Sequence, residues 1–478
     1  MRYLLLLLVA FLFSCASSPT PTPPNIVYIL ADDLGYGDLG CYGQKIIRTP
    51  NIDRLAKEGM LFTDHYAGSS VCAPSRAALM TGMHTGHSRV RGNYEKGPYG
   101  FGAGLELRAQ DVTLTEVLQE KGYTSAVIGK WGMGMDGTTG EPNKQGFDYS
   151  YGYLNQGHAH FQFPSYLFRN GQRIEIPENR NFANKLFSND LFTEEAVSFV
   201  ERNTEKPFFL YLAYTTPHAE MLLPESATFE SYKGKVDEKP YVKPGAPDST
   251  DTNAGAYRSQ PYPAAAYAAQ VTHLDSCVGV VMEKLKALGL DQNTIILFSS
   301  DNGPHSEGGA NPAYFGSSGP LRGKKRDLYE GGIRVPFIAR WPARIQPNTV
   351  TDYASAFWDM LPTLADIAGI TETKLETDGV SLLPTLIGQP EKQIDHPYLY
   401  WEFHENPSTD QAIRRGTWKA IRHDPQGKIE LYDLSTDLGE TKDLADKHPD
   451  VISEMNRLFD NARTPHPIWS LRSKSSTE

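Results

Sequence analysis

Polar residues that could bind a metal ion follow two of the strongly apolar runs in this sequence. The first run leads to Asp32 and Asp33, and the second leads to Asp301 and Asn302. All four side chains offer oxygen ligands, which Ca²⁺ and Mg²⁺ prefer, whereas zinc favours His and Cys. A single Asp at a strand end is more often a turn or cap residue, but two adjacent polar pairs favour a metal site.

A cysteine lies at a position that suits a nucleophile or an anion site. Cys72 opens the segment CAPSRAALMTG, in which Pro74 and Ser75 precede good helix formers and predict the start of a helix. The backbone N–H groups at such a start bind anions, and Arg76 adds a positive charge. On these grounds alone, Cys72 could equally be an inert thiol in the core.

The elements that must position these residues are predicted to be strands of one sheet. Four continuous apolar runs are typical of fully buried strands, and the other two end near Lys130 and His218. The runs are residues 25–30, 123–128, 208–213 and 294–298. Helical periodicity between them, as in residues 264–288, indicates a largely parallel α/β sheet covered on both faces. Ligands bind beyond the carboxyl ends of such strands, so the four ends are expected to meet at one crevice.

The last part of the chain has a different pattern, with short strands joined by turns. The expected elements are a helix at 357–369, strands at 398–403, 418–422 and 429–433, and a helix at 450–463. They predict a small antiparallel sheet with a helix. Two earlier stretches, residues 131–190 and 218–262, are expected to be irregular, and loops of that length are usually functional or disordered.

Composition and charge restrict the class of protein. The 478 residues include 46 Lys and Arg against 57 Asp and Glu, a formal charge of −11, and 40% are hydrophobic. These proportions are typical of a globular protein with a full core. The acidic balance argues against nucleic acid as a partner, and four cysteines are too few for a disulfide scaffold. Cys41 and Cys277 could pair in an oxidising compartment, but they are expected to be buried and unpaired.

The first residues are expected to be a targeting segment. A short basic start precedes an apolar run that ends in small residues, which is typical of a secretory signal over residues 1–14. The segment LFSC resembles a bacterial lipobox, which implies lipidation of Cys15, and residues 15–24 have the composition of an extended tether. The protein is therefore expected to be exported and held by this lipid in the periplasm or outer membrane of a Gram-negative bacterium.

The segment around Cys72 resembles the signature of the type I sulfatases, C-x-P-S-R-x-x-L-M-T-G. Further blocks match the family in the same order: ADDLG (31–35), GYTSAVIGK (122–130), TPH (216–218), SDNG (300–303) and LRGKKRDLYEGG (321–332). The resemblance covers nearly the whole chain after the leader. It implies an alkaline-phosphatase-like fold, with a mostly parallel, mixed central sheet flanked by helices in residues 25–390. A smaller subdomain of antiparallel sheet plus helix is implied for residues 391–478.

The resemblance also implies a cofactor and a metal ion. Cys72 would be converted to formylglycine by a formylglycine-generating enzyme or an anaerobic maturase, and the hydrated aldehyde would be the nucleophile. One Ca²⁺ would be held by oxygen ligands and by the converted cysteine. These metal ligands are Asp32, Asp33, Cys72, Asp301 and Asn302.

The same resemblance implies roles for the basic residues. Arg76 would orient the nucleophile, and Lys130, His218 and Lys325 would contact the sulfate group. Lys324, next to Lys325, is a second candidate for the last of these positions. Positive charges offset the repulsion between a sulfate ester and an anionic nucleophile. Asp301 is then a candidate general base, and His218 is the natural proton donor to the departing sugar oxygen.

One position departs from the family pattern. The block that contains Lys130 usually continues Lys-x-His, but here the sequence reads Lys130, Trp131, Gly132. The missing histidine is thought to assist the nucleophile or the release of sulfate. Either another histidine replaces it in space or the step proceeds without one. The sequence does not choose among four candidates: His84, His87, His158 and His160.

The expected activity is hydrolysis of the sulfate esters of a carbohydrate, for which a galacto-configured sugar is a guess from the breadth of the family. Two alternatives are a formylglycine-dependent phosphomonoester or phosphonate hydrolase and a catalytically silent protein that binds sulfated glycans. A two-zinc phosphatase is disfavoured because it needs further His and Asp ligands. Weak candidates for the substrate rim are His158, His160, Arg322, Glu402 and His404.

Overall fold

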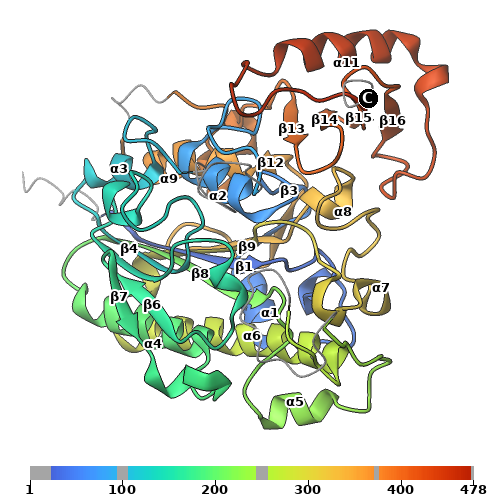
Figure 1. The fold of residues 1–478 in the computed structure, drawn as a ribbon. Helices are drawn as coiled ribbons and strands as arrows, with labels where there is room; N and C mark the ends of the chain where they lie inside the picture. Colours follow the sequence, from blue (N-terminus) through green and yellow to red (C-terminus); the bar gives the residue numbers. More distant parts are fainter. Residues whose placement is uncertain (1–22, 94–105, 244–256, 371–375, 475–478) are drawn as a thin grey trace, which may run out of the picture.

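A ten-stranded mixed sheet forms the centre of the protein, as the computed structural model shows (Figure 1). The structure describes residues 23–93, 106–243, 257–370 and 376–474. The strands are β1 (Asn25–Asp32), β2 (Met60–Phe62), β4 (Thr124–Lys130), β5 (Tyr149–Tyr153), β6 (Tyr166–Arg169), β7 (Gln172–Glu175), β8 (Phe208–Pro217), β9 (Thr294–Ser300), β10 (Phe337–Arg340) and β11 (Thr349–Thr351). Their order across the sheet is β11-β2-β10-β9-β1-β8-β4-β5-β6-β7.

The four strands predicted to carry the chemistry are neighbours at the centre of this sheet. They lie side by side as β9-β1-β8-β4, and all run parallel. Ala31 of β1 pairs with Ser300 of β9, so these two strands end at the same level. The prediction of a mostly parallel α/β sheet is therefore confirmed, and the carboxyl ends of the four strands meet at one edge.

Helices cover both faces of the sheet, because its strands are apolar on both sides. Along β1, Val27 and Ile29 enter one core layer, whereas Ile26 and Tyr28 enter the other. The first layer is covered by α1 (Pro50–Lys57), α4 (Ser188–Arg202) and α6 (Pro263–Ala287), and the second by α2 (Cys72–Thr81), α3 (Leu114–Gln119) and α9 (Met360–Ile367) (Figure 1). The remaining short helices of this part are α5 (Ala227–Tyr232), α7 (Pro312–Phe315), α8 (Glu330–Ile333) and α10 (Leu383–Leu386).

The prediction that residues 131–190 are irregular is wrong. The stretch contains β5, which extends the parallel sheet beside β4, and the hairpin of β6 and β7. Asn170 and Gly171 form the turn of that hairpin with φ of 50° and 74°, the positive values that favour an Asn-Gly pair. Residues 218–262 contain α5, and the part from 244 to 256 lies outside the described residues.

The C-terminal part forms a four-stranded antiparallel sheet, as predicted. Its strands are β13 (Leu399–Phe403), β14 (Asp410–Arg415), β15 (Trp418–Arg422) and β16 (Glu430–Asp433), of which β14 was not predicted. Helix α11 (Pro449–Asn461) packs on one face of this sheet. On the other face Trp401 packs with Tyr66 and Trp358, and its indole N–H donates to the carbonyl of Ala67 at 2.9 Å. This sheet is therefore joined to the large domain through a shared apolar layer. A further two-stranded sheet pairs β3 (His65–Tyr66) with β12 (Ser355–Ala356).

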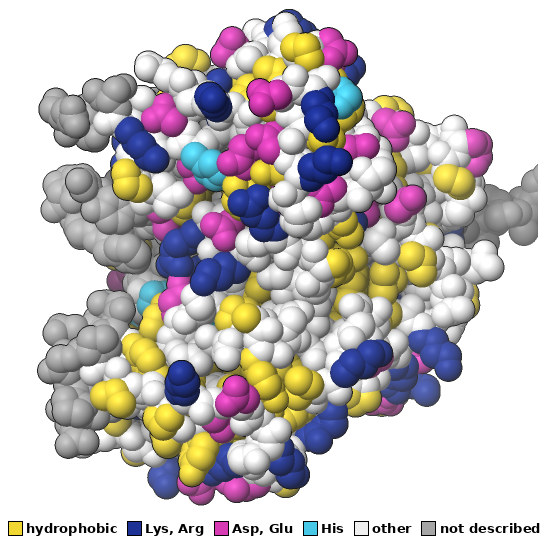
Figure 2. Space-filling view, turned by 90° about the vertical axis from the view of Figure 1, so that its right-hand side faces the viewer, with side chains coloured by type: hydrophobic (Ala, Val, Ile, Leu, Met, Phe, Trp, Pro, Cys, Tyr) yellow, Lys and Arg dark blue, Asp and Glu magenta, His cyan; other side chains and the backbone are white. Residues whose placement is uncertain are grey.

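Several predictions concern residues at the start of the chain or at its surface. The expected signal, residues 1–14, the lipidation site at Cys15 and most of the tether lie outside the described residues. Within the described ranges, no helix is both long and apolar enough to cross a membrane. Cys41 and Cys277 are free thiols; Cys277 is buried, whereas Cys41 is only partly so. Basic and acidic side chains are interspersed on the face shown in Figure 2.

Candidate active site

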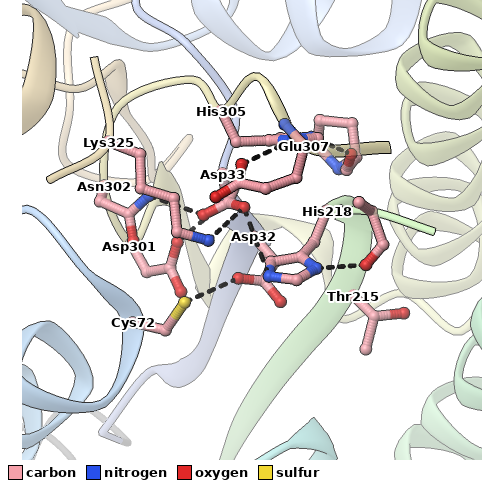
Figure 3. A network of polar contacts seen from close by, with 12 residues as sticks. Asp32, Asp33, Cys72, Thr215, His218, Asp301, Asn302, His305, Glu307 and Lys325 are labelled. Atoms are coloured by element: carbon pink, nitrogen blue, oxygen red, sulfur yellow. Dashed lines mark hydrogen bonds and ion pairs between the residues drawn. The ribbon is translucent and has the colours of Figure 1, made fainter. Parts of the chain in front are cut away.

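Two consecutive aspartates point into the crevice at the end of β1. Adjacent residues of a strand normally face opposite sides of the sheet. Here the strand ends at Asp32, and Asp33 takes a positive φ of 65°, a conformation that Asp adopts more readily than most residues. Both carboxylates are fully buried and contribute to the same polar network (Figure 3).

The end of β9 supplies the second pair of oxygen donors. Asp301 Oδ1 accepts the backbone N–H of Asp33 at 3.0 Å, which ties the two strand ends together. Asn302 Nδ2 donates to Asp33 Oδ1 at 2.7 Å and to the carbonyl of Gly303 at 2.9 Å. The amide oxygen of Asn302 is buried and has no hydrogen-bond partner within the described structure. An orphaned buried carbonyl oxygen among carboxylates is what a hard cation would bind.

The predicted nucleophile lies at the first residue of α2, as the sequence indicated. Cys72 Sγ lies 3.4 Å from Asp32 Oδ1. Burial and the Asp32 carboxylate raise the pKa of the Cys72 thiol, against the effect of Lys130, so the unmodified side chain is not a ready thiolate nucleophile. Helix α2 also carries Arg76, whose Nε and Nη2 both donate to Asp301 Oδ2, at 3.0 and 2.8 Å, while Nη1 donates to the carbonyl of Lys130.

Two lysines complete the charged centre. Lys130 Nζ lies 2.7 Å from Asp32 Oδ2, and Lys325 Nζ lies 2.7 Å from Asp33 Oδ2. Burial disfavours both ammonium groups, but the facing aspartates prevail and raise the pKa of each lysine above its ordinary value. Both lysines are therefore charged. Lys324, the second candidate, is exposed and donates to Ser306 Oγ instead.

His218 follows β8 and faces the same centre. Its Nδ1 contacts the carbonyl of Ala219, which can only accept, so Nδ1 carries the proton. Nε2 is then the nitrogen on the side of the crevice, 3.5 Å from Asp33 Oδ2. Burial, followed by Lys325 and Lys130, holds the pKa of His218 well below its ordinary value.

The donor set fits the calcium site implied by the sequence. Asp32, Asp33 and Cys72 lie in one buried cluster with His218, and the free oxygen of Asn302 adds a ligand from β9. Three aspartates are balanced by Lys130, Lys325 and Arg76, so a divalent ion would make the crevice net positive and favour a bound anion. The crevice is thus built from the ends of four strands and the start of α2.

A polar cavity of about 470 Å³ opens onto this centre, a size typical of small-molecule sites. It is lined by Cys72, Asn93, Gln156, His160, His218, Tyr257, Lys325, Arg326, His404, Glu405, Asn406, Pro407 and Arg472. The large domain supplies one wall, and the loop between β13 and β14 supplies the opposite one. The structure brings two of the predicted rim residues, His160 and His404, into this lining.

Three other predicted rim residues do not line the cavity. Glu402 is fully buried, and its carboxylate accepts hydrogen bonds at 2.8 to 2.9 Å that balance its charge. The donors are Arg91, Arg463 and His404. Arg322 stacks on the ring of Tyr329 and donates to the carbonyl of Glu440. His158 stacks on Tyr166 and faces a neighbouring cavity.

The four histidines considered for the missing position fall in different places. His84 and His87 stack on each other beside Asp378, and neither lines the cavity. His160 does line it and stacks on His218, with ring centres 4.8 Å apart. Of the four, His160 is therefore the one that the structure places at the centre.

Several polar residues of the site were not found from the sequence. His305 Nε2 lies 2.9 Å from the carbonyl of Pro217, and its Nδ1 lies 3.2 Å from Glu307, so this pair supports the loop of His218. Its position three residues after Asn302 was an available signal. Asn93 and Arg472 lie in segments without a pattern, and only the fold brings them to the cavity.

Comparisons with known proteins agree with this geometry. Residues 24–370 match the Sulfatase family, and residues 323–464 match the family described as N-sulphoglucosamine sulphohydrolase, C-terminal. The chain is 28% identical to an N-acetylgalactosamine-6-O-sulfatase of Bacteroides thetaiotaomicron, over 92% of this chain and 93% of the relative. It is 31% identical to arylsulfatase A of Homo sapiens, over 91% of this chain and 87% of that one.

The solved structures give the same result for the fold. The crystal structure of Ps i-CgsB in complex with k-i-k-neocarrahexaose superposes with a TM-score of 0.76 at 29% identity. The match covers 95% of this chain and 96% of that one. The shared architecture therefore extends over both the large domain and the C-terminal sheet.

Proposed function

The chain belongs to the sulfatase family and is a sulfuric ester hydrolase, and from this premise we propose that it removes sulfate from a carbohydrate through formylglycine made from Cys72 and a bound Ca²⁺. One observation carries this proposal. Cys72, three carboxylates and three cationic side chains converge in a single buried crevice that opens into a polar cavity.

The chemistry of the two absent groups defines what the chain itself must do. When formed and bound, formylglycine supplies a geminal-diol nucleophile and Ca²⁺ supplies positive charge at the sulfate. Asp32, Asp33, Asp301 and the amide oxygen of Asn302 would hold the ion. A separate formylglycine-generating enzyme or an anaerobic maturase would convert Cys72.

The basic residues bind and orient the sulfate ester. Lys130 and Lys325 are buried and charged, and each pairs with one of the two aspartates. Preorganised charge of this kind stabilises the negative charge that develops on the transferred group. Arg76 is held by three hydrogen bonds to Asp301 and to the carbonyl of Lys130, which fixes the start of α2 relative to the strand ends.

His218 is proposed as the donor of a proton to the departing sugar oxygen. Its Nδ1 is committed to the carbonyl of Ala219, so Nε2 is the nitrogen available to the substrate. Burial, together with Lys325 and Lys130, lowers the pKa of His218, and the negative charge of a bound sulfate ester would act in the opposite direction. A substrate would thus help to protonate the group that it needs.

We propose a sulfated, galacto-configured sugar as the substrate class, and two of the comparisons support it. One relative is named N-acetylgalactosamine-6-O-sulfatase, and a structural neighbour is in complex with k-i-k-neocarrahexaose. The cavity presents Asn93, His160, Asn406 and Arg472, side chains that hydrogen-bond to hydroxyl groups. No comparison favours a phosphate ester over a sulfate ester.

Export and anchoring are proposed from the sequence of the leader. The signal-like residues 1–14 and the lipobox at Cys15 support a lipoprotein of the periplasm or outer membrane of a Gram-negative bacterium. Metabolic labelling with a fatty acid, compared between the parent and Cys15→Ser, tests this. Equal labelling of the two would contradict it.

The proposed reaction is tested in two steps. Peptide mass spectrometry of protein made with a formylglycine-generating enzyme should show an aldehyde in place of the thiol at residue 72. That protein should then release sulfate from positionally defined sulfated monosaccharides and oligosaccharides, and from an aryl sulfate in preference to the matching aryl phosphate. Preferential release of phosphate would refute the proposal.

A further inference from the structure

Gly132, which replaces the family's histidine, lies at a position where a side chain would meet the head group of Gln156. Its φ is +81°, in the region that favours glycine. A Cβ atom at this position would lie 2.1 Å from the side-chain nitrogen Nε2 of Gln156. The head group of Gln156 therefore occupies the space into which a side chain at residue 132 would project.

The backbone explains why Gln156 is there. Strands β4 and β5 are parallel neighbours, and their pairing continues beyond the strand ends. The N–H of Trp131 donates to the carbonyl of Tyr153, and the N–H of Gly132 donates to the carbonyl of Leu154, each at 3.0 Å. This register brings Gln156, three residues after the end of β5, over Gly132.

The amide of Gln156 has the properties of a binding group that lacks its ligand. Gln156 is 6% exposed, and its Nε2 is buried without a hydrogen-bond partner among the described residues. A buried donor that is left unpaired costs about 1–3 kcal/mol, so such donors usually have a partner. The side chain lines the same cavity as Cys72, His218 and Lys325.

We propose that Gln156 replaces the missing histidine as a binding residue, and that its Nε2 donates a hydrogen bond to an oxygen of the sulfate group. This inference rests on the sulfatase reaction. A carboxamide does not exchange protons with substrate near neutral pH, so Gln156 can hold the sulfate but cannot act as a base. The chain thus keeps a hydrogen bond to the sulfate group at this position but lacks the titratable side chain of the family's histidine.

Binding of inorganic sulfate tests this without formylglycine. The parent is Cys72→Ala in buffer with Ca²⁺, and sulfate affinity is measured by calorimetry. Because a hydrogen bond to a charged group contributes about 1.5–3 kcal/mol, Gln156→Ala in this background should bind sulfate about tenfold to hundredfold more weakly. Gln156→Glu keeps the shape but replaces the donor with a carboxylate, so it should bind more weakly still.

Asn155 provides the matched control. It is the neighbour of Gln156, but its side chain accepts from the N–H of His158 and faces the other cavity. Asn155→Ala should keep the parent's sulfate affinity. If Gln156→Ala fails to fold, the isosteric Gln156→Glu decides the question.

The steric premise has its own test. Gly132→Ala should lower the unfolding temperature, and Gln156→Ala should relieve part of that loss when the two are combined. Unchanged sulfate affinity in both Gln156 variants would overturn the inference and leave the sulfatase proposal intact. Failure of the Cys72→Ala parent itself to bind sulfate would count against both.

Discussion

Replacing His218 separates its role in proton donation from a role in binding sulfate. A sugar alkoxide is a poor leaving group and needs a proton in the transition state, whereas a nitrophenolate leaves with little help. General acid catalysis contributes about 10²–10⁴-fold, which corresponds to about 3–5 kcal/mol of barrier. His218→Ala should therefore lose about that factor in kcat/KM on a sulfated sugar and much less on nitrophenyl sulfate.

Lys325→Ala is the control that the structure offers. Lys325 and His218 both face Asp33 Oδ2, at 2.7 and 3.5 Å, and both are buried. Lys325 can bind the sulfate group but is not proposed to protonate the leaving group, so its loss should affect the two substrates alike. The quantity to compare is the ratio of the two losses, which removes any effect common to both substrates.

The assay is initial-rate kinetics on the two substrates with fully converted enzyme, its formylglycine content checked by mass spectrometry. The ratio of losses should be about 10² or more for His218→Ala and about 1 for Lys325→Ala. An equal loss on both substrates in His218→Ala would show that this histidine only binds sulfate, and the acid role would have to be abandoned.

Three further predictions follow from the site. Cys72→Ala should abolish turnover while leaving the circular dichroism spectrum unchanged, since the change removes a small side chain whose thiol lies 3.4 Å from Asp32 Oδ1. Full activity would remove the nucleophile assignment. Chelation should abolish activity, and Ca²⁺ should restore it better than Zn²⁺. The activity of Asp301→Ala should not be restored by either ion. Undiminished activity in metal-free protein would contradict the assignment of a metal site. Glu402→Ala should destabilise by about 3–5 kcal/mol, because it leaves the buried Arg91 and the partly buried Arg463 without their carboxylate partner. The surface variant Glu58→Ala should cost about 0–1 kcal/mol in chemical unfolding, and equal losses would refute the reasoning.

The centre of the fold was predictable because its signals are local and repeated. Each central strand is a continuous apolar run, since both faces of the sheet are covered, and each run ends in a polar group. The rule that parallel strands bind ligands at their carboxyl ends then brings together residues as distant as Asp32 and Asp301. The helix start at Cys72 needed only Pro74, Ser75 and the good helix formers that follow.

The edges of the fold were harder, for physical reasons. Strands β6 and β7 are short and partly exposed, and β5, although buried at four of its five positions, has the sequence YSYGY, so all three lack the apolar runs that marked the centre. Strand β14 contains Asp410 and two arginines, whose charges hide a strand that is buried at five of its six positions. Glu402 was predicted at the substrate rim and not in the interior, because the arginines that neutralise it come from elsewhere in the chain.

The substitution at residue 132 shows what a sequence pattern leaves out. A motif records which side chain follows a strand, but the contact with substrate depends on which atom occupies a position in space. Here Gly132 has a positive φ, and the side chain of Gln156, from the segment after the neighbouring strand β5, occupies the space next to it. If Gln156 donates to the sulfate group as proposed, the contact at this position is made by a hydrogen-bond donor of another residue type.

The opposite wall of the cavity depends on how the C-terminal sheet is docked. Its loop, which carries His404 and Asn406, is held by Arg472, which donates to the carbonyls of both residues. Behind it, Glu402 binds His404 and also Arg91 of the large domain, so one buried carboxylate fixes both the loop and the junction. The charges for sulfate ester cleavage come from the strand ends and not from this junction. Substitutions at the junction can therefore change which sugar is bound without disturbing the cleavage chemistry.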